Sequence, residues 1–271
     1  MASSSVSQAT LPRPFDAVAA GYDASFTERR LGRWLRGMVW ERLGTAFQPG
    51  QHVLELGCGT GQDAVWLARR GVRVTATDVS TAMLDITRRK VDAAGVGDLV
   101  DVTELDLAEL APATLERQYD GAFSIFGPLN CMGERGALAA GLAGLVRPGG
   151  KVVLVVMGPV CPWEIGWHLA RGRFKSAFRR FRSGAEAHVG DGRTLRVWYP
   201  SAHRLEREFD PYFKTLEIAG IGLLLPPSEM GRVVDRAPRF FRRLARLDRR
   251  FATELPWRYL NDHYLMMLER Q

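Results

Sequence analysis

A cluster of glycines after a short apolar run most constrains what this chain can fold into. Val53, Leu54 and Leu56 form this run, which leads into Gly57, Gly59 and Gly61. An apolar run of this length is typical of a strand buried on both faces. Glycine lets the backbone turn tightly and approach a ligand, because no Cβ intervenes. The pattern predicts a strand, a ligand-binding turn and then a helix over 63–70.

Two acids near the glycines indicate which ligand the turn binds. Glu55 lies two residues before Gly57, and Asp78 ends a second strand-like run at 74–77. A carboxylate in the position of Asp78 can accept hydrogen bonds from both hydroxyls of a ribose. The loop reads G-x-G-x-G, whereas dinucleotide sites read G-x-G-x-x-G. Glu55 would repel a pyrophosphate but attract the sulfonium and ammonium groups of S-adenosylmethionine (SAM).

A third acid completes the pattern. Asp106 follows a third strand-like run at 99–103, and is well placed for the exocyclic amine of adenine. Any one of these acids alone would also fit a helix cap or a solvated loop. Four features in the expected order and spacing favour a nucleoside site instead.

With these motifs, the chain resembles the class I SAM-dependent methyltransferases, in the branch that acts on small molecules. The resemblance covers roughly residues 12–158, and it implies the fold and the cofactor but not the acceptor. The implied cofactor-binding residues are Tyr22, Glu55, Gly57, Cys58, Gly59, Gly61, Asp78, Val79, Met83, Asp106, Leu107 and Phe126.

The order of strand and helix signals predicts an α/β fold. They alternate from 51 to 157, which is typical of a doubly wound, Rossmann-like parallel sheet. In the family, two later runs, 213–225 and 263–270, would pair antiparallel and complete seven strands. The expected divisions are a disordered tail (1–10), the SAM-binding core (11–158), a mainly helical cap inserted over the acceptor site (159–201), and the end of the core sheet (202–271) with a helical insertion (226–256).

Three polar residues are candidates for catalysis. Asn130 follows the fourth strand, where it would hydrogen-bond a substrate oxygen or serve as a turn or helix cap. His168 and His188 lie in the cap and are candidate bases, although a lone histidine is more often structural. The cap also contains four aromatic residues, Trp163, Trp167, Trp198 and Tyr199. They fit contact with a flat or lipophilic acceptor, and they equally fit ordinary core packing.

The cysteines bear on the cell compartment. The chain has three, with no C-x-x-C pair, which favours reduced thiols, a cytoplasmic protein and no metal site. Residues 1–10 lack the basic start and apolar centre of a signal peptide. The apolar run around 152–157 is far too short to span a bilayer.

Two basic segments stand out against a net charge of +7. Residues 171–182 hold six cations and no acid, and Phe174, Phe178 and Phe181 recur at helical spacing. Residues 239–251 likewise combine many arginines with Phe and Leu residues. Both would be solvated helix faces, peripheral contacts with the anionic inner face of a membrane, or a nucleic-acid surface. Nucleic acid is the least favoured partner, because no RNA-binding module is visible.

The leading functional hypothesis is a methyltransferase that acts by in-line displacement on a small, lipophilic or aromatic metabolite. The sequence at 126–129 reads Phe-Gly-Pro-Leu. The family's Asn-Pro-Pro-Tyr type of motif, which marks many amine-methylating enzymes of nucleic acids and proteins, does not stand there. One alternative is a tRNA or rRNA methyltransferase, and another is a SAM-binding regulatory protein without turnover. The oligomeric state is left open.

Overall fold

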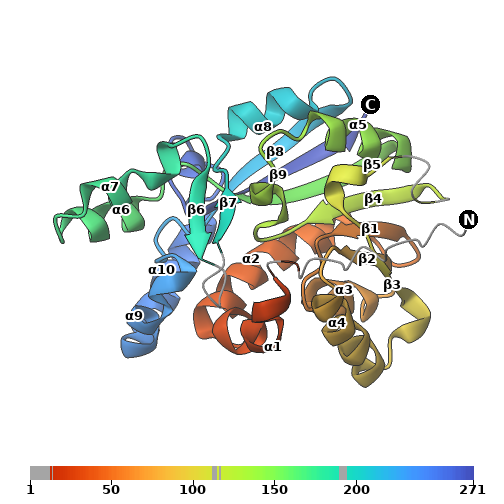
Figure 1. The fold of residues 1–271 in the computed structure, drawn as a ribbon, viewed down its shortest axis with the longest axis horizontal. Coiled ribbons are helices and arrows are strands. Elements are labelled where there is room, and N and C mark those ends of the chain that lie inside the picture. The colour runs from red at the N-terminus through yellow and green to blue at the C-terminus, as the bar shows by residue number, and fades with distance from the viewer. Residues whose placement is uncertain (1–12, 14, 112–114, 116, 189–193) are drawn as a thin grey trace, which may run out of the picture.

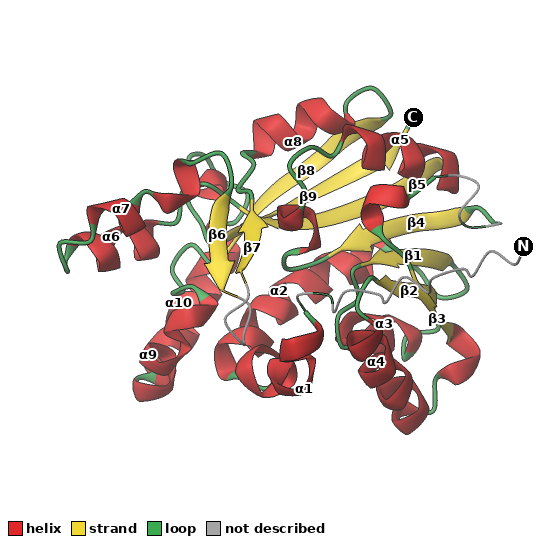
Figure 2. Cartoon of the chain, viewed as in Figure 1, coloured by secondary structure: helices red, strands yellow, loops and turns green. Residues whose placement is uncertain are grey.

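The computed structural model describes residues 13, 15–111, 115, 117–188 and 194–271. The tail predicted at 1–10 lies outside these residues. The described chain forms a central sheet with helices on both faces, and a smaller unit projects from one end (Figures 1 and 2).

Seven strands form the central sheet in the order β3-β2-β1-β4-β5-β9-β8. The first five are parallel, and β9 runs antiparallel to both β5 and β8. This confirms the predicted α/β class and the antiparallel edge pair. The strands are β1 (His52–Leu56), β2 (Arg73–Asp78), β3 (Val100–Glu104), β4 (Tyr119–Ser124), β5 (Val146–Met157), β8 (Phe213–Ile221) and β9 (His263–Arg270).

Helices connect and cover these strands. The α-helices are α1 (Ala19–Tyr22), α2 (Arg30–Ala46), α3 (Gln62–Ala68), α4 (Thr81–Ala94), α5 (Gly136–Leu145), α6 (Pro162–Leu169), α7 (Phe174–Ala177), α8 (Ala202–Phe209), α9 (Gly231–Arg236) and α10 (Pro238–Phe251). The shorter helical turns are η1 (Asp16–Val18), η2 (Asp23–Thr27), η3 (Gly97–Leu99), η4 (Leu107–Glu109), η6 (Pro128–Cys131), η7 (Arg179–Phe181), η8 (Ser228–Met230) and η9 (Trp257–Tyr259).

The sheet separates two hydrophobic cores. Val153 and Val155 of β5 pack into the core shared with α2, α3 and α4, whereas Val152 and Leu154 pack into the core shared with α5 and α8. Successive side chains of a strand point to opposite faces, so a strand covered on both sides is mostly apolar on both faces. This is why the predicted strands appear as mainly apolar runs without strict alternation.

The segment between β5 and α8 contains more than helices. After α6, α7 and η7 it forms a separate antiparallel hairpin of β6 (Ala185–His188) and β7 (Thr194–Val197). In Figure 1 this hairpin lies between the α6–α7 pair and the central sheet. The mainly helical cap predicted at 159–201 omitted the hairpin. The domain boundaries themselves stay a prediction.

The two basic segments fold differently. Residues 239–251 lie within α10, as their periodicity predicts. A single helical face across 171–182 was a wrong prediction, because the chain breaks there into α7 and η7. No helix in the described part of the chain is long and apolar enough to cross a bilayer.

Candidate active site

A cavity of about 390 Å³ opens where the parallel strands end. Its walls come from the loops after β1, β2, β3 and β4, from the N-terminal segment and from the β6–β7 hairpin. Loops at the carboxyl ends of parallel strands converge on one edge of a sheet, which is where α/β proteins bind ligands.

The glycine loop forms the floor of this cavity. Gly57, Gly59 and Gly61 all have φ between +54° and +73°. A Cβ on Gly57 would lie 2.3 Å from a side-chain carbon of Pro128, and one on Gly61 would lie 2.5 Å from Thr87. A Cβ on Gly59 would meet nothing within 4 Å. Gly59 therefore borders open space in the cavity, whereas the other two are held by close packing.

This difference predicts that alanine at position 61 lowers stability, whereas alanine at position 59 mainly weakens ligand binding. Gly61→Ala is expected to lower the free energy of unfolding by roughly 2–3 kcal/mol, because it adds overpacking to a left-handed backbone. Gly59→Ala carries only the backbone cost of about 1 kcal/mol, but its methyl group enters the ligand space. The Gly59→Ala variant should fold, and it should bind S-adenosylhomocysteine more weakly than the wild type does. Thermal unfolding and calorimetric titration measure both effects, and wild-type affinity in Gly59→Ala would contradict the assignment.

Asp78 holds the glycine loop from the end of β2. Its carboxylate accepts hydrogen bonds from the backbone N–H of Gly59 (2.8 Å) and of Ser80 (2.9 Å). Burial raises the pKa of Asp78, and these hydrogen bonds oppose the rise. Val79 and Met83 line the cavity next to it. The ribose position predicted for Asp78 therefore faces the cavity.

Residues after β3 lie beside Asp78, because the backbone N–H of Leu105 donates to the Asp78 carbonyl (3.0 Å). Asp106 and Leu107 are both lining residues, as the sequence analysis predicts. One carboxylate oxygen of Asp106 caps the following turn by accepting from the N–H of Ala108 (2.9 Å). Cys58, also predicted, lines the floor as a free buried thiol.

The N-terminal segment closes the cavity from above the glycine loop. Asp23 accepts a hydrogen bond from Thr60 Oγ1 (2.8 Å) and pairs with Lys90 (2.7 Å). Burial opposes ionisation of Asp23, yet the bonds from Lys90 and Thr60 outweigh it and lower its pKa. This attachment brings Tyr22 and Phe15 into the cavity wall.

A buried charge cluster lies at the far end of the glycine loop. Arg36 of α2 donates to Asp63 of α3, which also accepts from Trp40 Nε1 (2.6 Å). Arg36 and Asp63 line the cavity, whereas Glu55 lies behind the loop and is 2% exposed. Burial, together with the charge of Asp63, raises the pKa of Glu55 well above its usual value. Within the described structure, Arg36 Nε and Glu55 Oε2 are buried without a hydrogen-bond partner.

Arg36 lines the cavity although no sequence motif predicts it. It lies 27 positions before Asp63, on a helix outside the glycine motif, so no local spacing marks it.

The other half of the cavity is apolar. Phe126 has φ +58°, and its ring packs edge-on against Phe26 and His263, with centroids 5.3 and 5.1 Å away. Such a backbone strain in a non-glycine residue is typical of functional loops. The apolar wall continues through Ile125, Pro128, Met132, Met157, Ala187, Leu195 and Val197.

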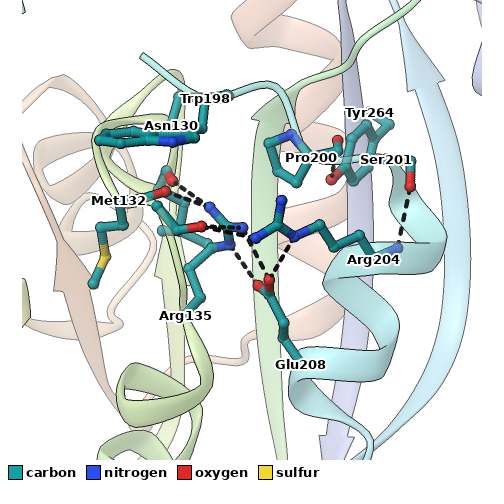
Figure 3. A network of polar contacts seen from close by, with 11 residues as sticks. Asn130, Met132, Arg135, Trp198, Pro200, Ser201, Arg204, Glu208 and Tyr264 are labelled. Carbon is teal, nitrogen blue, oxygen red and sulfur yellow. Dashed lines mark hydrogen bonds and ion pairs between the residues drawn. The ribbon is translucent and has the colours of Figure 1, made fainter. Parts of the chain in front are cut away.

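The loop after β4 is held by a buried arginine that the sequence analysis also missed. Arg135 is fully buried and forms a two-pronged ion pair with Glu208 of α8, at 2.6 and 3.0 Å (Figure 3). Its guanidinium also donates to the carbonyls of Leu129, Met132 and Gly133. These bonds fix the shape of the apolar wall.

Asn130, a predicted catalytic residue, lines the cavity, but its side-chain amide hydrogen-bonds to neighbouring backbone groups. Its Nδ2 donates to the carbonyls of Met157 (3.1 Å) and Trp198 (2.7 Å), and its Oδ1 accepts from Met157 N–H (3.0 Å). Both amide hydrogens are therefore occupied. Asn130 joins the loop after β4 to the end of β5 and to the chain leaving the cap.

The two predicted bases lie in different parts of the cap. His168 is on α6, outside the cavity wall, and its Nδ1 is buried without a partner in the described structure. His188 ends β6, directly after the lining residue Ala187, and its side chain lies outside what the structure describes. None of the four cap aromatics lines the cavity. Trp163, for example, packs against Phe241 of α10.

Comparisons with known proteins agree with this geometry. Residues 53–150 match the family model described as a methyltransferase domain. The demethylmenaquinone methyltransferase of Symbiobacterium thermophilum is 38% identical over 93 residues, which cover 32% of this chain and 36% of that protein. The malonyl-[acyl-carrier protein] O-methyltransferase of Serratia marcescens is 31% identical over 181 residues, 65% of each chain. Residues 53–150 therefore form a methyltransferase domain.

The fold of the chain is shared with a solved methyltransferase over nearly its whole length. The structure of the CcbJ methyltransferase from Streptomyces caelestis matches it with a TM-score of 0.60 at 18% identity, covering 95% of this chain and 97% of that one. The alignments with the two curated relatives are shorter and span less than two thirds of their lengths.

The residues in the cavity fit the family's cofactor, SAM. Three acids and one guanidinium line it, namely Asp63, Asp78, Asp106 and Arg36. This excess of negative charge suits a ligand with a sulfonium and an ammonium group, and it would repel a diphosphate. The open space at Gly59 and the unpartnered Arg36 Nε are further signs of a built ligand site. No group of His, Cys, Asp or Glu in the described residues is arranged to hold a metal ion.

Proposed function

We propose that this protein methylates a small, lipophilic or aromatic metabolite that binds in the apolar half of the cavity. The observation that carries this proposal is the composition of that wall, where Phe126, Met132, Met157 and the hairpin residue Leu195 surround the space beyond the glycine loop. The names of the two curated relatives specify demethylmenaquinone and malonyl-[acyl-carrier protein] as acceptors. These names support a metabolite acceptor without identifying it.

The polar half would hold the cofactor through residues already described. Asp78 would accept the ribose hydroxyls, Asp106 the adenine amine, and Val79 and Met83 would pack on the adenine ring. The free Nε of Arg36 would bind a carboxylate, and Asp63 would attract an ammonium group. Bound SAM supplies an electrophilic methyl group on its sulfonium.

The apolar wall would orient the acceptor and exclude water. Methyl transfer is an in-line displacement, and holding the two reacting atoms about 3 Å apart supplies much of the rate. The two rings that pack on Phe126 and the bonds of Arg135 keep this wall rigid. Asn130 would position the wall through its three bonds.

An acceptor that carries a proton on the reacting atom must lose it during methyl transfer, which calls for a general base. Among the described residues of the apolar half, Cys131 is the one titratable side chain, and burial raises its pKa to about 11. A neutral thiol is a poor base at neutral pH. His168 lies outside the cavity wall, so an acceptor that loses a proton would depend on His188, which follows the lining residue Ala187 and which we retain as a candidate base. Replacing each histidine by alanine and measuring kcat against pH tests this: His188→Ala should alter the profile and His168→Ala should not.

The activity test uses methyl-labelled SAM and a cell extract, followed by separation into organic, aqueous, RNA and protein fractions. We expect the label in the organic fraction, and Asp78→Ala should abolish it. Label in RNA would replace the proposal with an RNA methyltransferase. Binding of S-adenosylhomocysteine without any labelled product would favour a regulatory protein.

We also propose a cytoplasmic location. Cys58, Cys131 and Cys161 are free thiols, which a reducing compartment would preserve. Localisation of a tagged protein by cell fractionation tests this.

A further inference from the structure

Helix α10 has more apolar surface than its packing uses. Phe241 and Ala245 lie on one side of the helix and are buried in the core. Phe240, Leu247 and Phe251 follow one another at intervals of seven and four residues, so they share a different side. They are 56, 44 and 37% exposed.

The charged residues of α10 are almost all cationic. Its one acid, Asp248, is buried and accepts hydrogen bonds from the backbone N–H groups of Leu223 and Leu224. Arg249 pairs with Glu41 (2.9 Å). Five further arginines are exposed and form no ion pair within the described part of the chain; they are Arg239, Arg242, Arg243, Arg246 and Arg250.

The segment formed by α7 and η7 likewise combines exposed phenylalanines with exposed cations. Phe174, Phe178 and Phe181 are 65, 47 and 56% exposed, and Arg171, Arg173, Lys175 and Arg182 are exposed around them. The nearby acid Glu164 is buried in an ion pair with Arg180. This segment lies at the same end of the molecule as α10, and Trp163 of α6 packs on Phe241 of α10 (Figure 1). We call the exposed residues of 171–182 and 239–251 the basic aromatic face.

We propose that the basic aromatic face docks on the surface of an anionic lipid bilayer. An amphipathic helix lying in the interface buries its apolar side among the lipids while its arginines reach the anionic headgroups. A second copy of this chain would present the same cations and be repelled. Nucleic-acid phosphates would satisfy the arginines, and unpaired bases would stack on the phenylalanines, but Leu247 has no ring to stack on and would stay in water. This proposal goes beyond the methyl transfer proposed above and does not depend on it.

The test is sedimentation with vesicles, using the full chain. We expect the protein to pellet with phosphatidylglycerol vesicles at about 50 mM salt, to be released at about 500 mM, and to stay in solution with phosphatidylcholine. Two triple variants should each bind at least about tenfold more weakly. One is Phe240→Ser, Leu247→Ser and Phe251→Ser, and the other is Arg242→Glu, Arg243→Glu and Arg246→Glu.

A matched control carries changes elsewhere on the surface. Arg207→Glu on α8 with Leu216→Ser on β8 alters one exposed cation and one exposed leucine away from the face, and should bind as the wild type does. Equal unfolding temperatures and equal affinity for S-adenosylhomocysteine establish that the variants are folded. Wild-type protein that stays in the supernatant at low salt, or triple variants that bind as well as the control, would overturn the proposal. The proposal would also be overturned if transfer RNA displaced the vesicles from the protein and bound the triple serine variant as tightly as the wild type.

Discussion

Replacing Asp78 with alanine is expected to weaken the binding of S-adenosylhomocysteine roughly 100-fold. The carboxylate faces the cavity, and hydrogen bonds to a charged group contribute about 1.5–3 kcal/mol each. Two bonds to a ribose would account for a loss of this size. The N–H groups of Gly59 and Ser80 would also lose their acceptor, so the glycine loop would be less well ordered before binding.

Calorimetric titration with S-adenosylhomocysteine measures this loss without any acceptor. Asp85→Ala is the matched control, because Asp85 is an exposed acid of α4 that pairs with Arg88 (2.9 Å). It should bind as the wild type does. Since burial raises the pKa of Asp78, the affinity of the wild type should also fall as the pH is lowered, before an exposed aspartate would protonate. An Asp78→Ala protein with wild-type affinity would show that Asp78 does not hold the ligand.

Replacing Arg180 with methionine is expected to lower the free energy of unfolding by about 3–5 kcal/mol. Arg180 is 5% exposed and donates to Glu164 (2.9 Å) and Asp262 (2.6 Å). It also donates to the carbonyl of Gly158. These bonds join the cap to the start of β9. Without the guanidinium, two buried carboxylates lose a charge partner, which is the costly way to break a buried ion pair.

Urea unfolding of Arg180→Met and of Arg182→Met tests this. Arg182 is exposed and lies two residues further along, so its variant should have near wild-type stability. Burial opposes ionisation of Asp262, but the charges of His263 and Arg180 hold its pKa far below its usual value. A lowered carboxyl pKa contributes stability above the unfolded value of about 3.9 and loses it as the pH falls further. The difference between wild type and Arg180→Met should therefore shrink below about pH 4. Equal stability at pH 7 would contradict this account.

Local pattern was enough to predict the sheet and most of the residues that line the polar half of the cavity, although the predicted Glu55 lies outside its wall. Strands buried on both faces are mostly apolar on both sides, so β1, β4 and β5 are visible from their apolar residues. The loop from Gly57 to Gly61 needs left-handed backbone, which glycine supplies. Asp78 ends β2, and Asp106 lies two residues after β3. Each of these features depends on neighbours in the chain, and their side chains face the cavity as expected.

The remaining features depend on residues that are distant in the chain. Arg36 meets Asp63 across 27 positions, Arg135 meets Glu208 across 73, and Arg180 meets Asp262 across 82. An isolated arginine carries no periodicity that marks it as buried, because its partner is chosen by packing rather than by spacing. The same holds for Asn130, whose amide bonds to β5 and to the chain after β7. The hairpin that lines the apolar half of the cavity comes from two strands of four residues each. Their apolar and polar residues alternate, but the pattern is too short to mark a strand, so only the folded chain brings Leu195 and Val197 to the cavity.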